Sequence, residues 1–138
     1  MDRRNICSGS IGESTIGYSR LVKHGQYAFI SGTTSIDENG IVVGSGNSYL
    51  QTKHIIQIIE KSLKKISANL TDVVRTRIYV TNIEEWKSIG RAHAFTQCVS
   101  KSIQASHLTM DYTFSSTNTL FNWKNAWLFF WRKLDRNR

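Results

Sequence analysis

The 138-residue chain contains no proline, only two cysteines and no hydrophobic run of membrane-spanning length. Average usage of about 5% would give roughly seven prolines in such a chain. Cys7 and Cys98 lie far apart and form no Cys-x-x-Cys pair, so the sequence predicts neither a zinc site nor a disulfide framework. No apolar segment follows the charged first residues, as it would in a secretion signal. We therefore expect a cytoplasmic protein in a reducing compartment, without membrane contact.

The familiar catalytic and cofactor motifs are also missing. The sequence has no phosphate-binding loop, no dinucleotide-binding glycine triplet, no His-x-x-x-His pair and no nucleophile elbow. Its four histidines fall on a predicted loop, two predicted helices and a predicted strand; they are His24, His54, His93 and His107. We expect no metal site and no cofactor, and we interpret His93 as a half-buried helix residue rather than a catalytic one.

The composition suits one folded unit with a basic surface. An apolar content of 40% in 138 residues is enough for one hydrophobic core, so we expect a single domain over residues 1–138. The formal charge is +8, and residues 91–138 carry 7 basic and 2 acidic side chains against 11 and 8 in residues 1–90. Lysine and arginine release counterions from phosphates, which leaves RNA open as a partner, but many basic proteins never bind nucleic acid.

The first half of the chain predicts a hairpin, a turn and a long helix. Strands are expected at residues 20–22 and 27–31, joined by a Gly-containing loop. Residues 37–40, Asp-Glu-Asn-Gly, predict a turn after which extended structure resumes at 41–43. Ser48 opens the helix with Gln51 at capping-box spacing, and Asn69 is expected to end it in the left-handed conformation.

The second half predicts further strands and a second helix. Residues 73–81 alternate strictly, which places Val74, Thr76, Ile78 and Val80 toward the helices and Val73, Arg75, Arg77 and Tyr79 on the opposite side. Asn82 is expected to cap a helix with Glu85 at the box position and with a stripe of Trp86, Ile89 and His93. Residues 107–114 and 126–131 are also strand candidates.

This order of elements predicts an α+β fold in which helices cover one face of a mixed sheet. An uncovered sheet face in a domain of this size usually becomes an oligomer interface. The strand that ends in Ser31-Gly32-Thr33-Thr34 has small side chains and backbone groups that suit an anion or carboxylate. The same stretch also fits a plain strand-exit turn, and the residues alone leave both interpretations open.

Several motifs closely resemble the RidA/YjgF family, whose members are imine deaminases and are also called L-PSP endoribonucleases or translation inhibitors. They occur in the family's order over about residues 3–95: Arg3-Arg4-Asn5, Gly17-Tyr18-Ser19-Arg20, Phe29-Ile30-Ser31-Gly32-Thr33-Thr34, Asp37-Glu38-Asn39-Gly40, Gln51-Thr52, and the run from Asp72 to Thr81. The resemblance implies a chorismate-mutase-like α+β subunit, a homotrimer and three clefts between subunits. It implies that Tyr18, Ser31, Gly32 and Thr33 bind the substrate.

By the same resemblance, the activity is hydrolysis of 2-aminoacrylate, 2-iminopropanoate and related enamines or imines to a 2-keto acid and ammonia. No cofactor is needed, because a protonated imine is already electrophilic. The partners implied are a small carboxylate-bearing imine or keto acid and other copies of the same chain.

The sequence departs from the family pattern beyond about residue 96. Ser106 occupies the place of the family's carboxylate-binding arginine, and no arginine occurs between Ala92 and Trp131. The family's last strand carries a proposed catalytic glutamate, whereas no glutamate occurs here after Glu85. One hypothesis is a reading-frame slip or degenerate end, which translation of the coding DNA in the other frames would test.

Three functions therefore stay open from the sequence. The first is a cofactor-free imine deaminase, with the catalytic residues unknown. The second is a non-catalytic trimer that binds a small metabolite through Ser31-Gly32-Thr33. The third is an RNA-binding or endoribonuclease-type translation inhibitor, for which the sequence shows no acid/base pair and no stacking pattern of aromatic and basic residues.

Overall fold

The computed structural model describes residues 2–96, 100–105 and 127–133. The strands are β1 (Arg3–Ile6), β2 (Leu21–His24), β3 (Tyr27–Thr33), β4 (Arg75–Val80), β5 (Ser100–Ala105) and β6 (Trp127–Lys133). The α-helices are α1 (Ile11–Ile16), α2 (Ser48–Lys64) and α3 (Trp86–His93). Short 3-10 helices follow α2, precede α3 and follow α3; they are η1 (Leu70–Asp72), η2 (Ile83–Glu85) and η3 (Ala94–Thr96).

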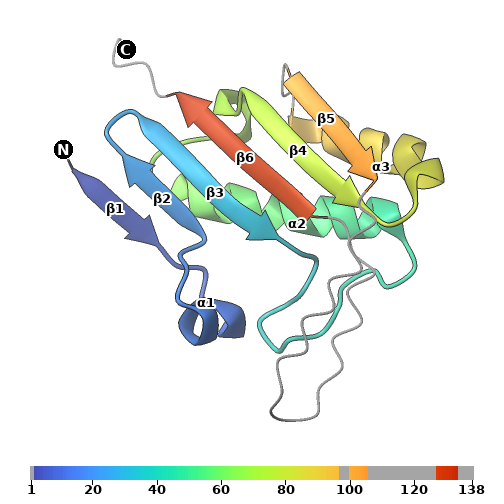
Figure 1. Cartoon of the computed structure of the whole chain (residues 1–138), viewed down its shortest axis with the longest axis horizontal. Helices are drawn as coiled ribbons and strands as arrows, with labels where there is room; N and C mark the ends of the chain where they lie inside the picture. Colours follow the sequence, from blue (N-terminus) through green and yellow to red (C-terminus); the bar gives the residue numbers. More distant parts are fainter. Residues whose placement is uncertain (1, 97–99, 106–126, 134–138) are drawn as a thin grey trace.

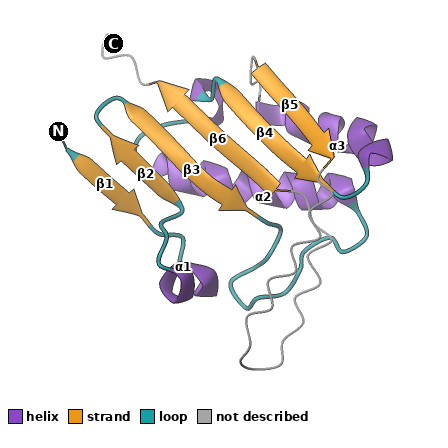
Figure 2. Ribbon diagram, viewed as in Figure 1, coloured by secondary structure: helices purple, strands orange, loops and turns teal. Residues whose placement is uncertain are grey.

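The six strands form one mixed sheet in the order β1-β2-β3-β6-β4-β5. Neighbouring strands pair antiparallel except β4 and β5, which are parallel. Helices α2 and α3 lie on the same face of this sheet (Figure 1), and Figure 2 shows α1 at the end of β1 and β2, away from the other two helices. The predicted α+β class, with helices on one face of a mixed sheet, is therefore confirmed.

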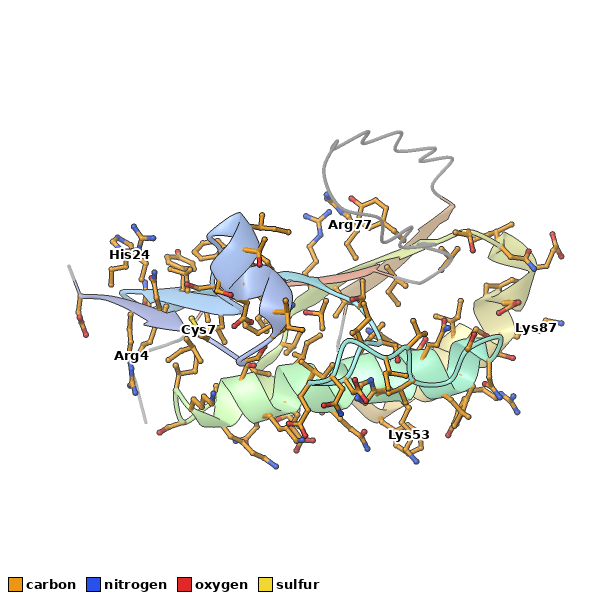
Figure 3. All side chains as sticks on the ribbon, turned by 90° about the horizontal axis from the view of Figure 1, so that it is seen from below. Arg4, Cys7, His24, Lys53, Arg77 and Lys87 are labelled. Atoms are coloured by element: carbon orange, nitrogen blue, oxygen red, sulfur yellow. The ribbon has the colours of Figure 1, made fainter. Side chains whose placement is uncertain are left out.

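The core lies between the sheet and α2. Apolar residues four positions apart on α2, namely Ile55, Ile59 and Leu63, are at most 1% exposed. They pack in one cluster with Leu21 of β2 and Ile78 of β4. The helix forms because its apolar positions fall on one stripe, while its lysines stay on the solvent side, as Lys53 does in Figure 3. The predicted burial on β4 also holds, because Thr76, Ile78 and Val80 are buried.

The ends of α2 differ from the sequence prediction. Its N-cap is Asn47 rather than Ser48, and the Asn47 side chain accepts a hydrogen bond from the Leu50 N–H. The left-handed residue after its C-terminus is Ser67, with φ of 58°, rather than Asn69. Ala68 N donates to Leu63 O and Ser67 N donates to Lys64 O, which is the hydrogen-bond pattern of a Schellman motif.

Other parts of the prediction need correction. Strand β1 and helix α1 were not predicted, and the extended stretch predicted at 41–43 is reduced to one bridge between Ile36 and Val42. Asn82 caps η2 rather than α3, accepting from the Glu84 N–H. On α3, Trp86 is 51% exposed, whereas His93 is fully buried rather than half-buried.

In the strand predicted at 73–81, the regular alternation of buried and exposed residues begins later than expected. Val74 is 41% exposed while Val73 is buried, because the regular alternation begins only at Arg75, where β4 begins. The strand candidate at 107–114 lies outside the described residues, and the candidate at 126–131 overlaps β6.

The face of the sheet opposite α2 is not covered by any helix of the described chain (Figure 3). Phe29 of β3 is 43% exposed there, and Val22 of β2 pairs beside it in register. Arg75 and Arg77 of β4 are exposed, and Figure 3 shows Arg77 pointing away from the helices. In the part of the chain that the structure describes, no helix is both long and apolar enough to cross a bilayer.

Candidate functional site

Helix α1 ends just before Tyr18, the first of the predicted site residues. Gly17 takes the left-handed conformation with φ of 79°, and its N–H donates to Glu13 O. Tyr18 N also donates to Glu13 O, at 3.2 Å. This turn redirects the chain from α1 into β2, which leaves the half-buried Tyr18 ring beside Gly12: a Cβ at Gly12 would lie 3.4 Å from the Tyr18 hydroxyl.

The other predicted site residues lie at a bulge in β3. Ile30 pairs with Phe130 and Thr33 pairs with Leu128, so three steps along β3 face two steps along β6. A bulge leaves one residue outside the regular ladder, and bulges are frequent next to active sites. Ser31 and Gly32 occupy this irregular interval.

A buried carboxylate, that of Glu13, is paired with Arg20. Glu13 is only 5% exposed, and its side chain accepts hydrogen bonds from Ser8 N at 2.8 Å, Ser8 Oγ at 2.6 Å and Gly9 N at 3.1 Å. Its Oε1 also lies 3.3 Å from Arg20 Nε. A buried carboxylate is stable when it is paired and hydrogen-bonded in this way.

Arg20 connects this carboxylate to both parts of the site. Its Nη1 donates to Gly32 O at 2.9 Å and to Thr33 Oγ1 at 3.0 Å. Its Nη2 donates to Tyr18 Oη and to Ser10 Oγ, each at 3.3 Å. The guanidinium carbon also lies 5.5 Å from the centre of the Tyr18 ring, within range of a cation–π contact. Arg20 is 5% exposed, so the network is shielded from water.

The side chains of the β3 bulge are largely used inside the protein. Ser31 Oγ donates to Ser19 O at 2.7 Å, and Ser31 N donates to Arg20 O at 3.0 Å. Thr33 is 1% exposed, and its hydroxyl donates to Ser31 O while accepting from Arg20. Ser31 and Gly32 are half-buried. The half-buried residues of this wall are therefore Tyr18, Ser31 and Gly32, and the Ser31 N–H and the Gly32 carbonyl are already used by Arg20.

These residues form a surface suited to binding rather than to proton transfer. The charge of Arg20 is balanced by Glu13 at 3.3 Å, so the wall holds no net charge from this pair. Tyr18 and backbone amides are neutral donors, which can hold a carboxylate or polarise a carbonyl. We call this set of residues the Tyr18 wall: Tyr18, Arg20, Ser31, Gly32 and Thr33.

The structure brings the four predicted binding residues into one network, because Arg20 contacts Tyr18, Gly32 and Thr33 and the backbone of Ser31. Ser106, predicted in the place of the family arginine, lies outside the described residues, as does most of the divergent segment. Sequence reasoning gave no role to Glu13 or Arg20. The available signal was a charged residue directly before the apolar Leu21-Val22 of the predicted strand.

The histidines do not converge on this wall. His24 is exposed at the end of β2, His93 is buried on α3, and His107 lies outside the described residues. Across residues 2–96, 100–105 and 127–133, no three His, Cys, Asp or Glu side chains are grouped to hold a metal ion. His54 Nδ1 lies 3.1 Å from Ser35 Oγ, on the connection between β3 and α2.

The His54 contact has a defined direction. Ser35 Oγ has one proton and donates it to Val43 O at 2.7 Å, so His54 Nδ1 is the donor toward Ser35. Burial lowers the pKa of His54 below its usual value, the charge of Lys61 lowers it further, and Asp37 opposes this shift. The contact therefore ties α2 to the connection that follows β3, and it does not involve a residue of the Tyr18 wall.

The family model described as endoribonuclease L-PSP matches residues 10–110. The uncharacterized protein SCO2049 of Streptomyces coelicolor is 29% identical over 90 residues, which cover 65% of this chain and 66% of that protein. The 3-aminoacrylate deaminase RutC of Acinetobacter baylyi is 27% identical over 77 residues, which cover 56% of this chain and 61% of RutC. The chain thus spans less than two thirds of the length of these curated relatives.

Among solved structures, the chain is similar to Rv2704 of Mycobacterium tuberculosis, a member of the YjgF/YER057c/UK114 family. The two are 30% identical with a TM-score of 0.72, and the match covers 96% of this chain and 100% of Rv2704. The α+β fold described above is therefore one that crystallography has observed in a protein of similar sequence.

Proposed function

Because the chain belongs to the endoribonuclease L-PSP family, the RidA/YjgF family that its motifs resemble, we propose that it is a cofactor-free hydrolase of small imines and enamines. The Tyr18 wall binds the carboxylate end of the substrate. The observation that carries this proposal is the Arg20 network, which joins the Tyr18 hydroxyl to the β3 bulge and presents neutral donors on one wall.

The proposed reaction converts a 2-imino acid and water into a 2-keto acid and ammonia. An enamine first gains a proton on its terminal carbon and loses one from its nitrogen, which gives the imine. Water then adds to the imine carbon, forming a C–O bond, and the nitrogen gains a proton. The C–N bond breaks, the hydroxyl loses its proton, and ammonia leaves. A site of this kind works mainly by holding the substrate and one water in position.

The substrate class follows from the donors on the wall and from one named relative. The Tyr18 hydroxyl offers a hydrogen bond to an oxygen acceptor, which a carboxylate supplies in two equivalent positions. The RutC relative is named for deamination of 3-aminoacrylate, a small enamine with a carboxylate. We propose the same class of substrate here, a carboxylate with an imine or enamine within two carbons.

We further propose a homotrimer as the working form, in which a neighbouring subunit supplies the opposite wall of the cleft. The uncovered face of the sheet supports this, because Phe29 of β3 is 43% exposed there beside Val22 of β2. An apolar sheet face of this kind is usually covered by another chain. Phe29→Arg should therefore lower the molar mass measured by light scattering to that of the monomer.

A second candidate is a trimer that binds a keto acid or similar metabolite without turnover. It is favoured by two gaps in the sequence: no arginine lies between Ala92 and Trp131, and no glutamate follows Glu85. An arginine supplies two charge-assisted bonds to a carboxylate, and a serine such as Ser106 cannot replace them. The Tyr18 wall would then serve binding alone.

The decisive measurement is the rate at which enzymatically generated 2-iminopropionate disappears in the presence of the trimeric fraction, against a protein-free control. Turnover that falls about fivefold in Tyr18→Phe and stays unchanged in Arg4→Lys supports the hydrolase, since one hydrogen bond is worth about 1 kcal/mol. No acceleration by a folded trimer refutes it. Stabilisation by pyruvate without turnover would then select the binding function, and salt-dependent retention of RNA would select neither.

A further inference from the structure

We infer that Arg20 is a positioning residue that sets the Tyr18 hydroxyl as a hydrogen-bond donor to the ligand and locks it to the β3 bulge. This inference rests on the proposed binding of a carboxylate at the Tyr18 wall. It assigns to Arg20 a part in ligand recognition even though its guanidinium is 5% exposed and does not reach the ligand itself.

All the directions in which Arg20 can donate are occupied inside the protein. Nε donates to Ser8 Oγ at 3.5 Å and forms an ion pair with Glu13 at 3.3 Å, Nη1 donates to Gly32 O and Thr33 Oγ1, and Nη2 donates to Tyr18 Oη and Ser10 Oγ. A guanidinium has five N–H groups and no acceptor, so these partners use its full donor capacity. Arg20 is therefore not a substitute for the arginine that the family carries nearer the C-terminus.

The hydrogen bond from Arg20 determines whether the Tyr18 hydroxyl can donate or accept toward a ligand. Because Arg20 Nη2 can only donate, the Tyr18 oxygen is the acceptor in the 3.3 Å contact. The single phenol proton is then available on the other side of the oxygen. Tyr18 thus presents a donor, which suits a carboxylate or keto oxygen and disfavours an ammonium group.

The same guanidinium fixes the distance between Tyr18 and the bulge. Its two Nη atoms belong to one rigid plane, with Tyr18 bonded at Nη2 and the Gly32 carbonyl bonded at Nη1. Glu13 holds that plane from the Nε side, and Glu13 is itself fixed by Ser8 and Gly9. A lysine at position 20 would carry the same charge but could not span both sides of this arrangement.

The test is a double-mutant cycle on pyruvate affinity, measured by calorimetry with wild type, Arg20→Lys, Tyr18→Phe and the double variant. Each single substitution should weaken pyruvate about tenfold, the equivalent of one charge-assisted or neutral hydrogen bond. If Arg20 acts through Tyr18, then Arg20→Lys in the Tyr18→Phe background should change affinity less than about twofold. Losses that multiply to about a hundredfold would mean a general structural role and would overturn the inference.

A second measurement keeps the inference testable if the wild type does not bind pyruvate. Carbon-13 labelled tyrosine gives one ring signal for Tyr18, assigned by its loss in Tyr18→Phe. Arg20→Lys should shift this signal, and the surface control Arg4→Lys should leave it in place. Absence of pyruvate binding refutes the proposed function, whereas an unshifted Tyr18 signal in folded Arg20→Lys refutes the positioning role itself.

Discussion

Alanine substitutions at Gly44 and Gly46 test how the connection from β3 is fitted to the start of α2. Both glycines have left-handed backbone conformations, with φ of 71° and 73°. A Cβ at Gly44 would lie 2.8 Å from Leu50 Cβ and 3.1 Å from Gln51 N, whereas a Cβ at Gly46 would meet no atom within 4 Å. The two substitutions therefore share the backbone cost and differ in the steric one.

The shared cost is the left-handed conformation of a residue with a Cβ, about 1–2 kcal/mol. A smaller entropy loss from the unfolded chain offsets about 0.4–1 kcal/mol of it. Gly46→Ala should therefore lower the free energy of unfolding by about 1 kcal/mol. Gly44→Ala adds overpacking against the backbone of the first turn of α2, typically about 1–3 kcal/mol, for a total loss of about 2–4 kcal/mol.

Urea unfolding followed by circular dichroism measures both losses, provided the slope with urea is the same as for the wild type. The prediction concerns the difference between the two variants, because errors in the shared backbone cost cancel. Equal destabilisation by the two substitutions would refute the close approach of Gly44 to Leu50, and a larger loss at Gly46 would contradict the whole account of this turn.

Three further substitutions test local features of the same chain. Asn47→Ala should lower the free energy of unfolding by about 1 kcal/mol through loss of the α2 cap, and Ser48→Ala should have almost no effect. A larger loss for Ser48→Ala than for Asn47→Ala in urea unfolding would mean that Ser48 is the cap, as the sequence predicted. Ser67→Gly should stabilise by about 1 kcal/mol because φ is 58°, and a loss of stability would refute the left-handed assignment. The lowered pKa of His54 means that the unfolded chain binds more protons below about pH 6.5, so stability should fall on acidification; His54→Gln should reduce this fall and His24→Gln should not.

The strand and helix patterns that could be predicted are those in which burial has a regular period. In β4, alternate residues are buried, and the sequence shows this directly at Thr76, Ile78 and Val80. The α2 stripe is visible for the same reason. In contrast, β1 has the sequence Arg-Arg-Asn-Ile, in which three exposed polar residues give no period, and the strand is held by main-chain pairing with β2.

The candidate site was only partly predictable, because its organisation depends on contacts between separate elements. Tyr18 and Ser31-Gly32-Thr33 could be named from motifs, but Glu13 lies on α1 and Arg20 lies directly before β2, seven residues further along the chain. A pattern of residue types does not show that the Arg20 guanidinium contacts Ser10, Tyr18 and the end of β3 at once. The structure also shows that the hydroxyls of Ser31 and Thr33 donate hydrogen bonds inside the protein, which residue types alone do not reveal.

The occupied donors of Arg20 lead to a prediction about the missing arginine of the family. Since Arg20 is neutralised by Glu13 and its donors are used, a bound carboxylate at the Tyr18 wall is held by neutral groups. Ser106→Arg should then tighten pyruvate binding at least about tenfold, because it adds a charge-assisted fork where the present wall has none. The gain should shrink as salt is raised, because salt screens the added charge, and it should depend little on Arg20→Lys, because Arg20 does not itself contact the ligand. Equal affinity in a folded, trimeric Ser106→Arg protein would mean that position 106 does not reach the cleft, and the correspondence with the family's arginine would be wrong.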